Sequence, residues 1–381
     1  MKKDKIKSKK FAKIRTLLIP MGFAVICGII IALFLESLIG ELSPEKYIGT
    51  FFVLLALLYF SYFLQIIIHE AGHLFFGLMT GYRFSSFRIG NFMWIKDDNG
   101  KLILRRYSLQ GTGGQCLMVP PDMADGKIPF VLYNLGGSMF NVISAPVFWG
   151  LYYVLKNVYF VSMFFLFMSI FGIVSALINA IPLRIGAVDN DGRNAYMLRN
   201  NPVALHDFWV QLKVNEATSK NIRIKDMPGE WFTVPDKESI SNSLTATTAV
   251  FSVNRFMDMH QFSEASALID DLLGTDKAMI PLLRNLLICD RIFCELIEEK
   301  DNDFIEELRT EEYINFIKQM RNNPSVIRTE YAYALLFEKN ADQAQKIEAQ
   351  FEKRMRTYPY LCEVESEREL MDIAAGKAMA V

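Results

Sequence analysis

The sequence predicts an α-helical membrane protein with about four transmembrane helices, a small β-hairpin between the second and third helices, and a C-terminal soluble α-helical domain. Hydrophobic residues make up 51% of the 381 residues, and 30 residues are Phe. Residues 1–200 carry 20 Lys and Arg against 11 Asp and Glu, whereas residues 201–381 carry 21 against 31. The apolar composition and the change of charge indicate one part in lipid and one part in water.

The first element is a basic tail, residues 1–15, which holds eight Lys and Arg and one Asp. An apolar segment from Thr16 to Gly40 follows at once. This segment is longer than the apolar core of a signal peptide and has no obvious small-residue cleavage site, so we expect a retained membrane anchor. Its basic end should lie in the cytoplasm.

Three more apolar segments are each near the roughly 20 residues that a helix needs to cross a bilayer. They run from Tyr47 to Thr80, from Pro129 to Leu155 and from Tyr159 to Pro182. Residues 16–200 are therefore expected to form a core embedded in the lipid bilayer. Four crossings return the chain to its starting side, so we expect an integral protein of a bacterial cell membrane with its N- and C-termini in the cytoplasm.

Between the second and third spans, two β-prone runs, Phe87–Ile95 and Leu102–Tyr107, flank the turn sequence Asp98-Asn99-Gly100. Asn-Gly tolerates positive φ at both turn positions, which predicts a hairpin. The stretch Gly111-Thr112-Gly113-Gly114 follows. It is interpreted either as a flexible turn or as a short exposed strand edge that pairs with an extended substrate.

Residues 201–381 have the composition of a soluble domain, with helical periodicity from Asn242 to the end. Ala249–Leu273 and Thr329–Arg356 each fit a helix, a break and a second helix. These pairs fit tetratricopeptide-like hairpins, and equally an ordinary helical bundle, because no clean repeat of about 34 residues is present. The acidic surface favours a cytoplasmic protein partner over membrane attachment, and we expect no nucleic-acid partner.

The segment from Phe51 to Ile68 contains no charged residue, and His69-Glu70-Ala71-Gly72-His73 follows it directly. On a helix the two imidazoles lie on one face and can bind one metal ion, with Glu70 close to the metal's water. Ionisable groups at membrane depth cost about 2.5–3.5 kcal/mol each, so a functional role is expected. A chance H-E-x-x-H in an ordinary helix is the alternative interpretation.

Zn²⁺ suits such a site because it takes nitrogen and oxygen ligands in tetrahedral geometry, polarises a carbonyl group and lowers the pKa of its water to roughly 7. Two histidines leave room for a carboxylate ligand. After the fourth span the chain has Asn179-Ala180-Ile181-Pro182 and then Asp189-Asn190-Asp191-Gly192. Pro182 ends the apolar helix, which lets the chain direct a carboxylate back toward the histidines. A polar turn at the membrane surface is the alternative.

These motifs, together with Gly137-Ser138-Met139-Phe140-Asn141, resemble those of the site-2 protease family of intramembrane zinc metalloproteases. The resemblance covers roughly residues 16–200 and implies a metal-dependent peptidase. It implies the following roles: His69, His73 and Asp191 as Zn²⁺ ligands, Glu70 as general base, Asn141 and Gly137 beside the substrate, and Asn179 and Pro182 shaping the approach to the metal.

The sequence departs from the family pattern in its spacing and at two residues. The distance along the chain from Pro182 to Asp191 is longer than in the compact family form, and Asn190 replaces an aliphatic residue. Asp189 therefore competes with Asp191 for the role of third ligand, although the glycine after Asp191 favours the latter. Ser138 replaces the proline that often follows the first residue of the G-x-x-x-N motif.

The resulting expectation is an intramembrane zinc endopeptidase that cuts transmembrane segments or signal-peptide remnants. Glu70 would take a proton from water and pass it to the leaving amine. The substrate helix must unwind, because a helix hides its carbonyls in its own hydrogen bonds. Two alternatives come from other classes. One is a catalytically silent membrane scaffold or immunity-type protein that acts through its C-terminal helices, and the other is a channel or transporter, for which the few intramembrane charges give little support.

Overall fold

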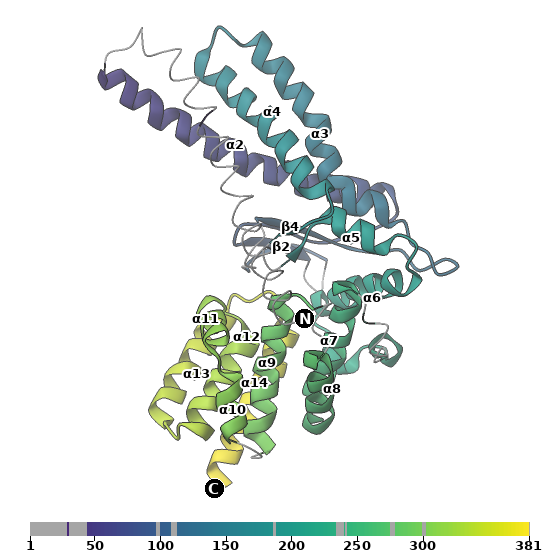
Figure 1. The fold of residues 1–381 in the computed structure, drawn as a ribbon, viewed down its shortest axis with the longest axis vertical. Coiled ribbons are helices and arrows are strands. Elements are labelled where there is room, and N and C mark those ends of the chain that lie inside the picture. The colour runs from purple at the N-terminus through teal and green to yellow at the C-terminus, as the bar shows by residue number, and fades with distance from the viewer. Residues whose placement is uncertain are drawn as a thin grey trace, which may run out of the picture.

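The computed structural model describes residue 29 and residues 44–96, 100–107, 113–185, 188–233, 240, 242–274, 279–298 and 302–380. Within these residues the protein is mostly helical, with three long apolar helices, a four-stranded antiparallel sheet and a C-terminal helical region (Figure 1). The predicted basic tail, residues 1–15, and the predicted first span from Thr16 to Gly40 lie outside the described residues, apart from residue 29.

The three apolar helices α2 (Pro44–Met79), α3 (Phe130–Val154) and α4 (Tyr159–Ala180) form a bundle at one end of the molecule (Figure 1). Each is long and apolar enough to cross a membrane, which indicates membrane association and agrees with three of the four predicted spans. Phe52 is 61% exposed and Val154 is 72% exposed on the outside of this bundle. Such apolar outer surfaces are suited to lipid rather than to water.

Single residues determine where these helices end and how closely they pack. Gly81, with a φ of +86°, closes α2, since Gly adopts this conformation without steric cost. Pro182 follows the end of α4 because its ring and missing N–H cannot continue a helix. α2 and α3 cross where Gly72 faces Gly136, and a Cβ on Gly72 would lie 2.3 Å from the Gly136 oxygen. This close crossing brings α3 against the H-E-x-x-H turn of α2.

The sheet has the strand order β3-β2-β1-β4, and every neighbouring pair is antiparallel. Its strands are β1 (Arg83–Ile89), β2 (Phe92–Lys96), β3 (Leu102–Arg106) and β4 (Gly114–Val119). The predicted hairpin is present as β2–β3, in which Lys96 pairs with Leu102. The prediction of one strand from Phe87 to Ile95 is wrong, because the chain reverses at Gly90, whose φ of +57° is a turn conformation. The sheet has two strands more than the predicted hairpin, β1 and β4, and β4 lies at one edge of the sheet.

From residue 249 on, the C-terminal helical region packs around one apolar core, whereas residues 204–217 belong to two other apolar clusters. Its helices are α6 (Pro202–Ser219), α7 (Ser243–Asp258), α8 (Phe262–Gly274), α9 (Pro281–Glu298), α10 (Asn302–Leu308), α11 (Glu311–Gln319), α12 (Pro324–Ala332), α13 (Ala341–Met355) and α14 (Leu361–Ala380). Buried Arg328 on α12 contacts Asp290 on α9 at 2.5 Å and Glu367 on α14 at 2.8 Å, so one cation joins three helices. The predicted helix–break–helix pairs are present as α7–α8 and α12–α13, while the tetratricopeptide-like assignment stays a prediction.

The helical region contacts the sheet near β4 and near the end of β3. α6 packs on β4, where Phe208 and Met118 belong to one apolar cluster. Near the end of β3, the ring of Tyr107 meets the rings of Tyr358 and Tyr360, which precede α14, edge to face. The sheet therefore lies between the apolar helices and the C-terminal helical region (Figure 1).

Candidate metal centre

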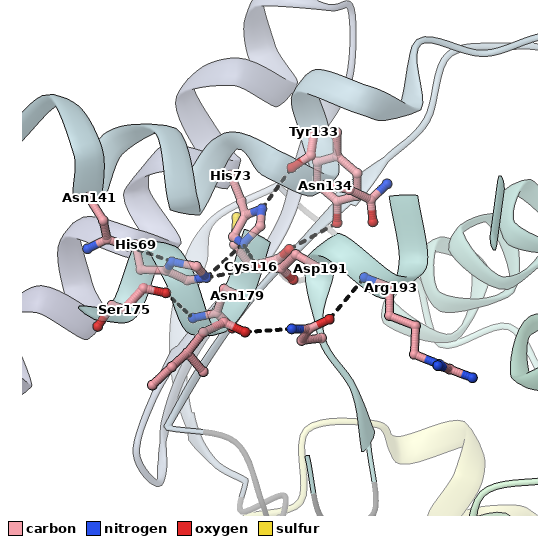
Figure 2. Close-up of polar contacts among 12 residues, drawn as sticks. His69, His73, Cys116, Tyr133, Asn134, Asn141, Ser175, Asn179, Asp191 and Arg193 are labelled. Carbon is pink, nitrogen blue, oxygen red and sulfur yellow. Dashed lines mark hydrogen bonds and ion pairs between the residues drawn. The ribbon is translucent and has the colours of Figure 1, made fainter. Parts of the chain in front are cut away.

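The candidate metal centre consists of His69, His73 and Asp191. The two histidines lie one turn apart on α2, and Asp191 begins α5 (Asp191–Leu198), which follows the short strands β5 (Arg184–Ile185) and β6 (Val188–Asp189). Oδ2 of Asp191 lies 3.0 Å from Nε2 of His69 and 3.3 Å from Nε2 of His73. The two Nε2 atoms are 3.2 Å apart, so three potential ligand atoms meet at one point (Figure 2).

The other ring nitrogen of each histidine is engaged. Nδ1 of His69 lies 2.7 Å from Oδ1 of Asn141, and Nδ1 of His73 lies 2.7 Å from the main-chain oxygen of Tyr133 (Figure 2). Both partners are acceptors here, so each Nδ1 carries the hydrogen and each Nε2 of a neutral ring presents a lone pair. Two imidazole lone pairs and a carboxylate oxygen of Asp191 thus face one another.

Such an arrangement is suited to a cation. A proton on one Nε2 satisfies that ring and the carboxylate but leaves the second ring's lone pair facing them, whereas one metal ion satisfies all three atoms. Ligands that bind a tetrahedral Zn²⁺ at about 2.0–2.1 Å lie about 3.3 Å from one another. The observed separations of 3.0, 3.2 and 3.3 Å match this spacing. The His69, His73 and Asp191 group can therefore hold a metal ion.

Glu70 lies beside the candidate metal centre without belonging to it. Its side chain is buried, 7% exposed, and it borders the same cavity as the two histidines. It packs against the first residue of β4, since a Cβ on Gly114 would lie 2.6 Å from Oε1 of Glu70. This is a suitable position for the predicted general base, which is not required to be a metal ligand.

Asp191, and not Asp189, reaches the histidines. The carboxylate of Asp189 is held by Arg184 at 2.7 Å, by Arg193 at 2.9 Å and by the hydroxyl of Ser243, which donates to it. Its side chain is only 4% exposed within this cluster. Asp189 therefore ties β5 and β6 to α5 and α7, and of the two carboxylates it is that of Asp191 which lies beside both histidines.

Asn190, which stands where the family pattern has an aliphatic residue, connects the end of α4 to the start of α5. Its Nδ2 donates to the carbonyl of Ile178 at 2.5 Å, and its Oδ1 accepts from the main-chain N–H of Arg193 at 2.9 Å. Gly192 allows the same close contact, because a Cβ there would lie 2.0 Å from the oxygen of Ala180. The glycine after Asp191 is thus explained by the packing of α5 on the end of α4.

The remaining predicted site residues differ in their surroundings. Gly137 lies against His69, since a Cβ there would be 2.5 Å from the ring carbon Cε1. Asn141 is fully buried and contacts His69. Asn179 lines the cavity, whereas Pro182 is exposed and is not among the described residues that line it. The contacts of these four residues with a substrate stay predictions.

A cavity of about 550 Å³ opens at the candidate metal centre. Its walls include Gln115 of β4, Asn194 of α5 and Asn215 of α6. Within the described ranges these three carboxamide side chains make no hydrogen bond. Of the predicted stretch from 111 to 114, the last two residues are described, and they lead into the edge strand β4 at the cavity wall. Gly114 is thus the first residue of an edge strand, while pairing of this edge with a substrate stays a prediction.

Two residues that support the candidate metal centre were not predicted from the sequence: Gln65 and Tyr133. Gln65 precedes His69 by one helical turn, so it lies on the face of α2 that carries both histidines, and this spacing could have identified it. Tyr133 contacts His73 through its main-chain oxygen. Such a contact does not depend on a particular side chain, so no sequence pattern could have predicted it.

Comparison with known proteins gives no match from which a function could be inferred. No family model matches the chain, and neither a curated protein nor a solved structure matches it. The features that bear on function are therefore physical: a buried group of two imidazoles and one carboxylate that can hold a metal ion, a second carboxylate beside it, and a cavity at a sheet edge.

Proposed function

We propose that the chain is an intramembrane zinc endopeptidase of the site-2 protease type, which hydrolyses peptide bonds in transmembrane segments or signal-peptide remnants. The observation that carries the proposal is the convergence of His69, His73 and Asp191 to separations of 3.0–3.3 Å. Glu70 stands next to them, and α2, which bears three of these four side chains, is long and apolar enough to cross a membrane. A site on such a helix suits a substrate that is itself in the membrane.

Zn²⁺ is the proposed metal because two imidazole nitrogens and one carboxylate oxygen leave a fourth tetrahedral position open. When bound there, Zn²⁺ would polarise the substrate carbonyl and lower the pKa of a water molecule to about 7. The chain itself orients the ligands. Asn141 and the Tyr133 carbonyl hold both imidazole rings with Nε2 toward the metal position.

Glu70 is the proposed general base. It takes a proton from the attacking water while the water oxygen bonds to the carbonyl carbon of the substrate. It then delivers this proton to the amide nitrogen as the C–N bond breaks, which leaves a carboxylic acid and an amine. Such a group contributes about 10²–10⁴-fold to a reaction rate.

The proposed substrate is an extended, uncharged peptide segment. The outer side of β4 pairs with no other described strand, so an unwound segment can add there as a further strand. Gln115, Asn194 and Asn215 offer amide donors and acceptors toward the cavity, and these groups complement main-chain N–H and C=O. A transmembrane helix must unwind first, since only then are its carbonyls accessible.

The test compares the wild-type protein with Glu70→Gln, which keeps the size of the side chain but removes the base. Each detergent-purified protein is mixed with a pool of membrane-protein fragments, and new N-termini are identified by mass spectrometry. We expect new N-termini with the wild type and a loss of about 10²–10⁴-fold in their rate of formation with Glu70→Gln, at unchanged zinc content.

Glu264→Gln, at an exposed position on α8, is the matched control, because it makes the same chemical change outside the candidate metal centre, and it should cleave as the wild type does. Equal cleavage by the wild type and Glu70→Gln would contradict the peptidase. That result would favour the catalytically silent scaffold that acts through the C-terminal helices.

A further inference from the structure

Gln65 is a fully buried polar side chain on α2, one helical turn before His69. Its Nε2 lies 2.6 Å from the main-chain oxygen of Met168 on α4, and its Oε1 lies 2.6 Å from Nδ2 of Asn141 on α3. Asn141, also fully buried, places its Oδ1 2.7 Å from Nδ1 of His69. A relay of three hydrogen bonds therefore runs from α4 through α2 and α3 to a candidate metal ligand.

The main-chain oxygen of Met168 determines the direction of each hydrogen bond in this relay. A main-chain carbonyl can only accept, so Gln65 presents its NH₂ group to Met168 and its amide oxygen to Asn141. Asn141 then donates through Nδ2 and turns Oδ1 toward His69 (Figure 2). His69 satisfies this oxygen with Nδ1–H, so its Nε2 keeps the lone pair that a metal ion needs.

We propose that Gln65 is a positioning residue of the metal centre, which acts through Asn141 to hold His69 in the tautomer that binds the metal. The inference rests on the proposed metal function, and it assigns Asn141 to the support of His69 rather than to the substrate. Asn141 Nδ2 also donates to the main-chain oxygen of residue 65, at 3.3 Å, so loss of the Gln65 side chain leaves it this longer hydrogen bond alone. The amide is then held less firmly and can turn its NH₂ group toward Nδ1, which moves the ring proton of His69 to Nε2. Loss of the partner behind a ligating histidine costs about 10–100-fold in metal affinity.

Gln65→Leu removes the relay and keeps a side chain that favours a helix. Ser61→Ala is the matched control, because Ser61 is also fully buried on α2 and donates to the Phe164 carbonyl of α4 at 3.4 Å, one turn farther from His69. Both variants lose a hydrogen bond between α2 and α4, but only Gln65→Leu breaks the relay. Zn²⁺ affinity is measured on the full-length, detergent-purified protein by chelator competition, and Co²⁺ absorption spectra report the geometry of the ligands.

Asn141→Asp separates control of the tautomer from packing. A carboxylate has no donor, so it accepts from Nδ1–H of His69 whichever residue stands at position 65. We therefore expect the double variant Gln65→Leu/Asn141→Asp to regain most of the Zn²⁺ affinity that Gln65→Leu loses. A purely structural role for Gln65 predicts no such rescue.

The expected result is Zn²⁺ binding that is about 10–100-fold weaker in Gln65→Leu, with an altered Co²⁺ spectrum, and within about twofold of wild type in Ser61→Ala. Unchanged affinity in Gln65→Leu, or a folded double variant without rescue, would overturn this inference and leave the proposed function standing. A wild-type protein that binds neither ion would overturn both. If Gln65→Leu does not fold, Gln65→Met, which is closer to Gln in length, replaces it in the same comparison.

Discussion

His69, His73 and Asp191 could be predicted as candidate ligands because each belongs to a local pattern. The histidines are four positions apart on one helix, and both carboxylates of the Asp-x-Asp-Gly stretch stand after the last apolar span. The choice between Asp189 and Asp191 could not be made in this way. It depends on the hydroxyl of Ser243, which lies 54 residues further along the chain and helps to hold Asp189 away from the histidines.

Asp191→Ala should lower zinc occupancy more than Asp189→Ala does. Loss of a ligand should weaken Zn²⁺ binding by more than the roughly 10–100-fold that loss of a supporting partner costs. Asp189→Ala should instead lower the unfolding temperature, because Arg184 and Arg193 lose their carboxylate, at a cost on the order of 1–3 kcal/mol. Metal analysis and thermal unfolding of both purified variants check this. The opposite order of zinc occupancy would transfer the third-ligand role to Asp189.

At the scale of elements, the apolar helices were predictable from length and composition, whereas the sheet was only partly so. The run from Phe87 to Ile95 has β-character throughout, and a local pattern does not reveal that Gly90 divides it into two strands. The close contact of α3 with α2 could not be predicted from the sequence either. Gly137 matches a motif that the resemblance links to substrate, yet its surroundings show that it gives His69 space.

Gly137→Ala should weaken Zn²⁺ binding at least about tenfold, because the added Cβ would lie 2.5 Å from Cε1 of His69 and displace the ring. Gly150→Ala is the control on the same helix, since nothing lies within 4 Å of its Cβ. The control should bind Zn²⁺ as the wild type does and gain up to about 1 kcal/mol of helix stability. Chelator competition measures both affinities. Equal affinities would show that the spacing of α2 and α3 does not determine the site.

At the scale of the molecule, the C-terminal helical region is joined to the sheet and contributes a wall of the cavity. Composition predicted a soluble region after residue 200, but it could not show that α6 packs on β4. That contact depends on residues far apart in the chain, as in the hydrogen bond from Trp209 to the carbonyl of Pro121 at 3.0 Å, across 88 residues. A truncation that removes α6 would therefore remove part of the cavity wall, including Asn215.

The turn between α3 and α4 should lie on the opposite side of the membrane from the helical region, as their places at the two ends of the molecule imply (Figure 1). Lys156→Cys in this turn and Asp342→Cys on α13 both place a thiol at an exposed position. An impermeant maleimide should label Lys156→Cys in intact cells and Asp342→Cys only after permeabilisation, since the predicted termini are cytoplasmic. The parent protein is the control for native cysteines. Labelling of Asp342→Cys in intact cells would reverse the topology.

X-ray absorption at the zinc edge of the purified full-length protein shows directly whether His69, His73 and Asp191 form a zinc centre. We expect about one Zn²⁺ per chain, with nitrogen and oxygen ligands at about 2.0–2.1 Å that include two imidazoles. A protein that holds no zinc, or zinc bound by sulfur and without imidazole, would contradict this expectation.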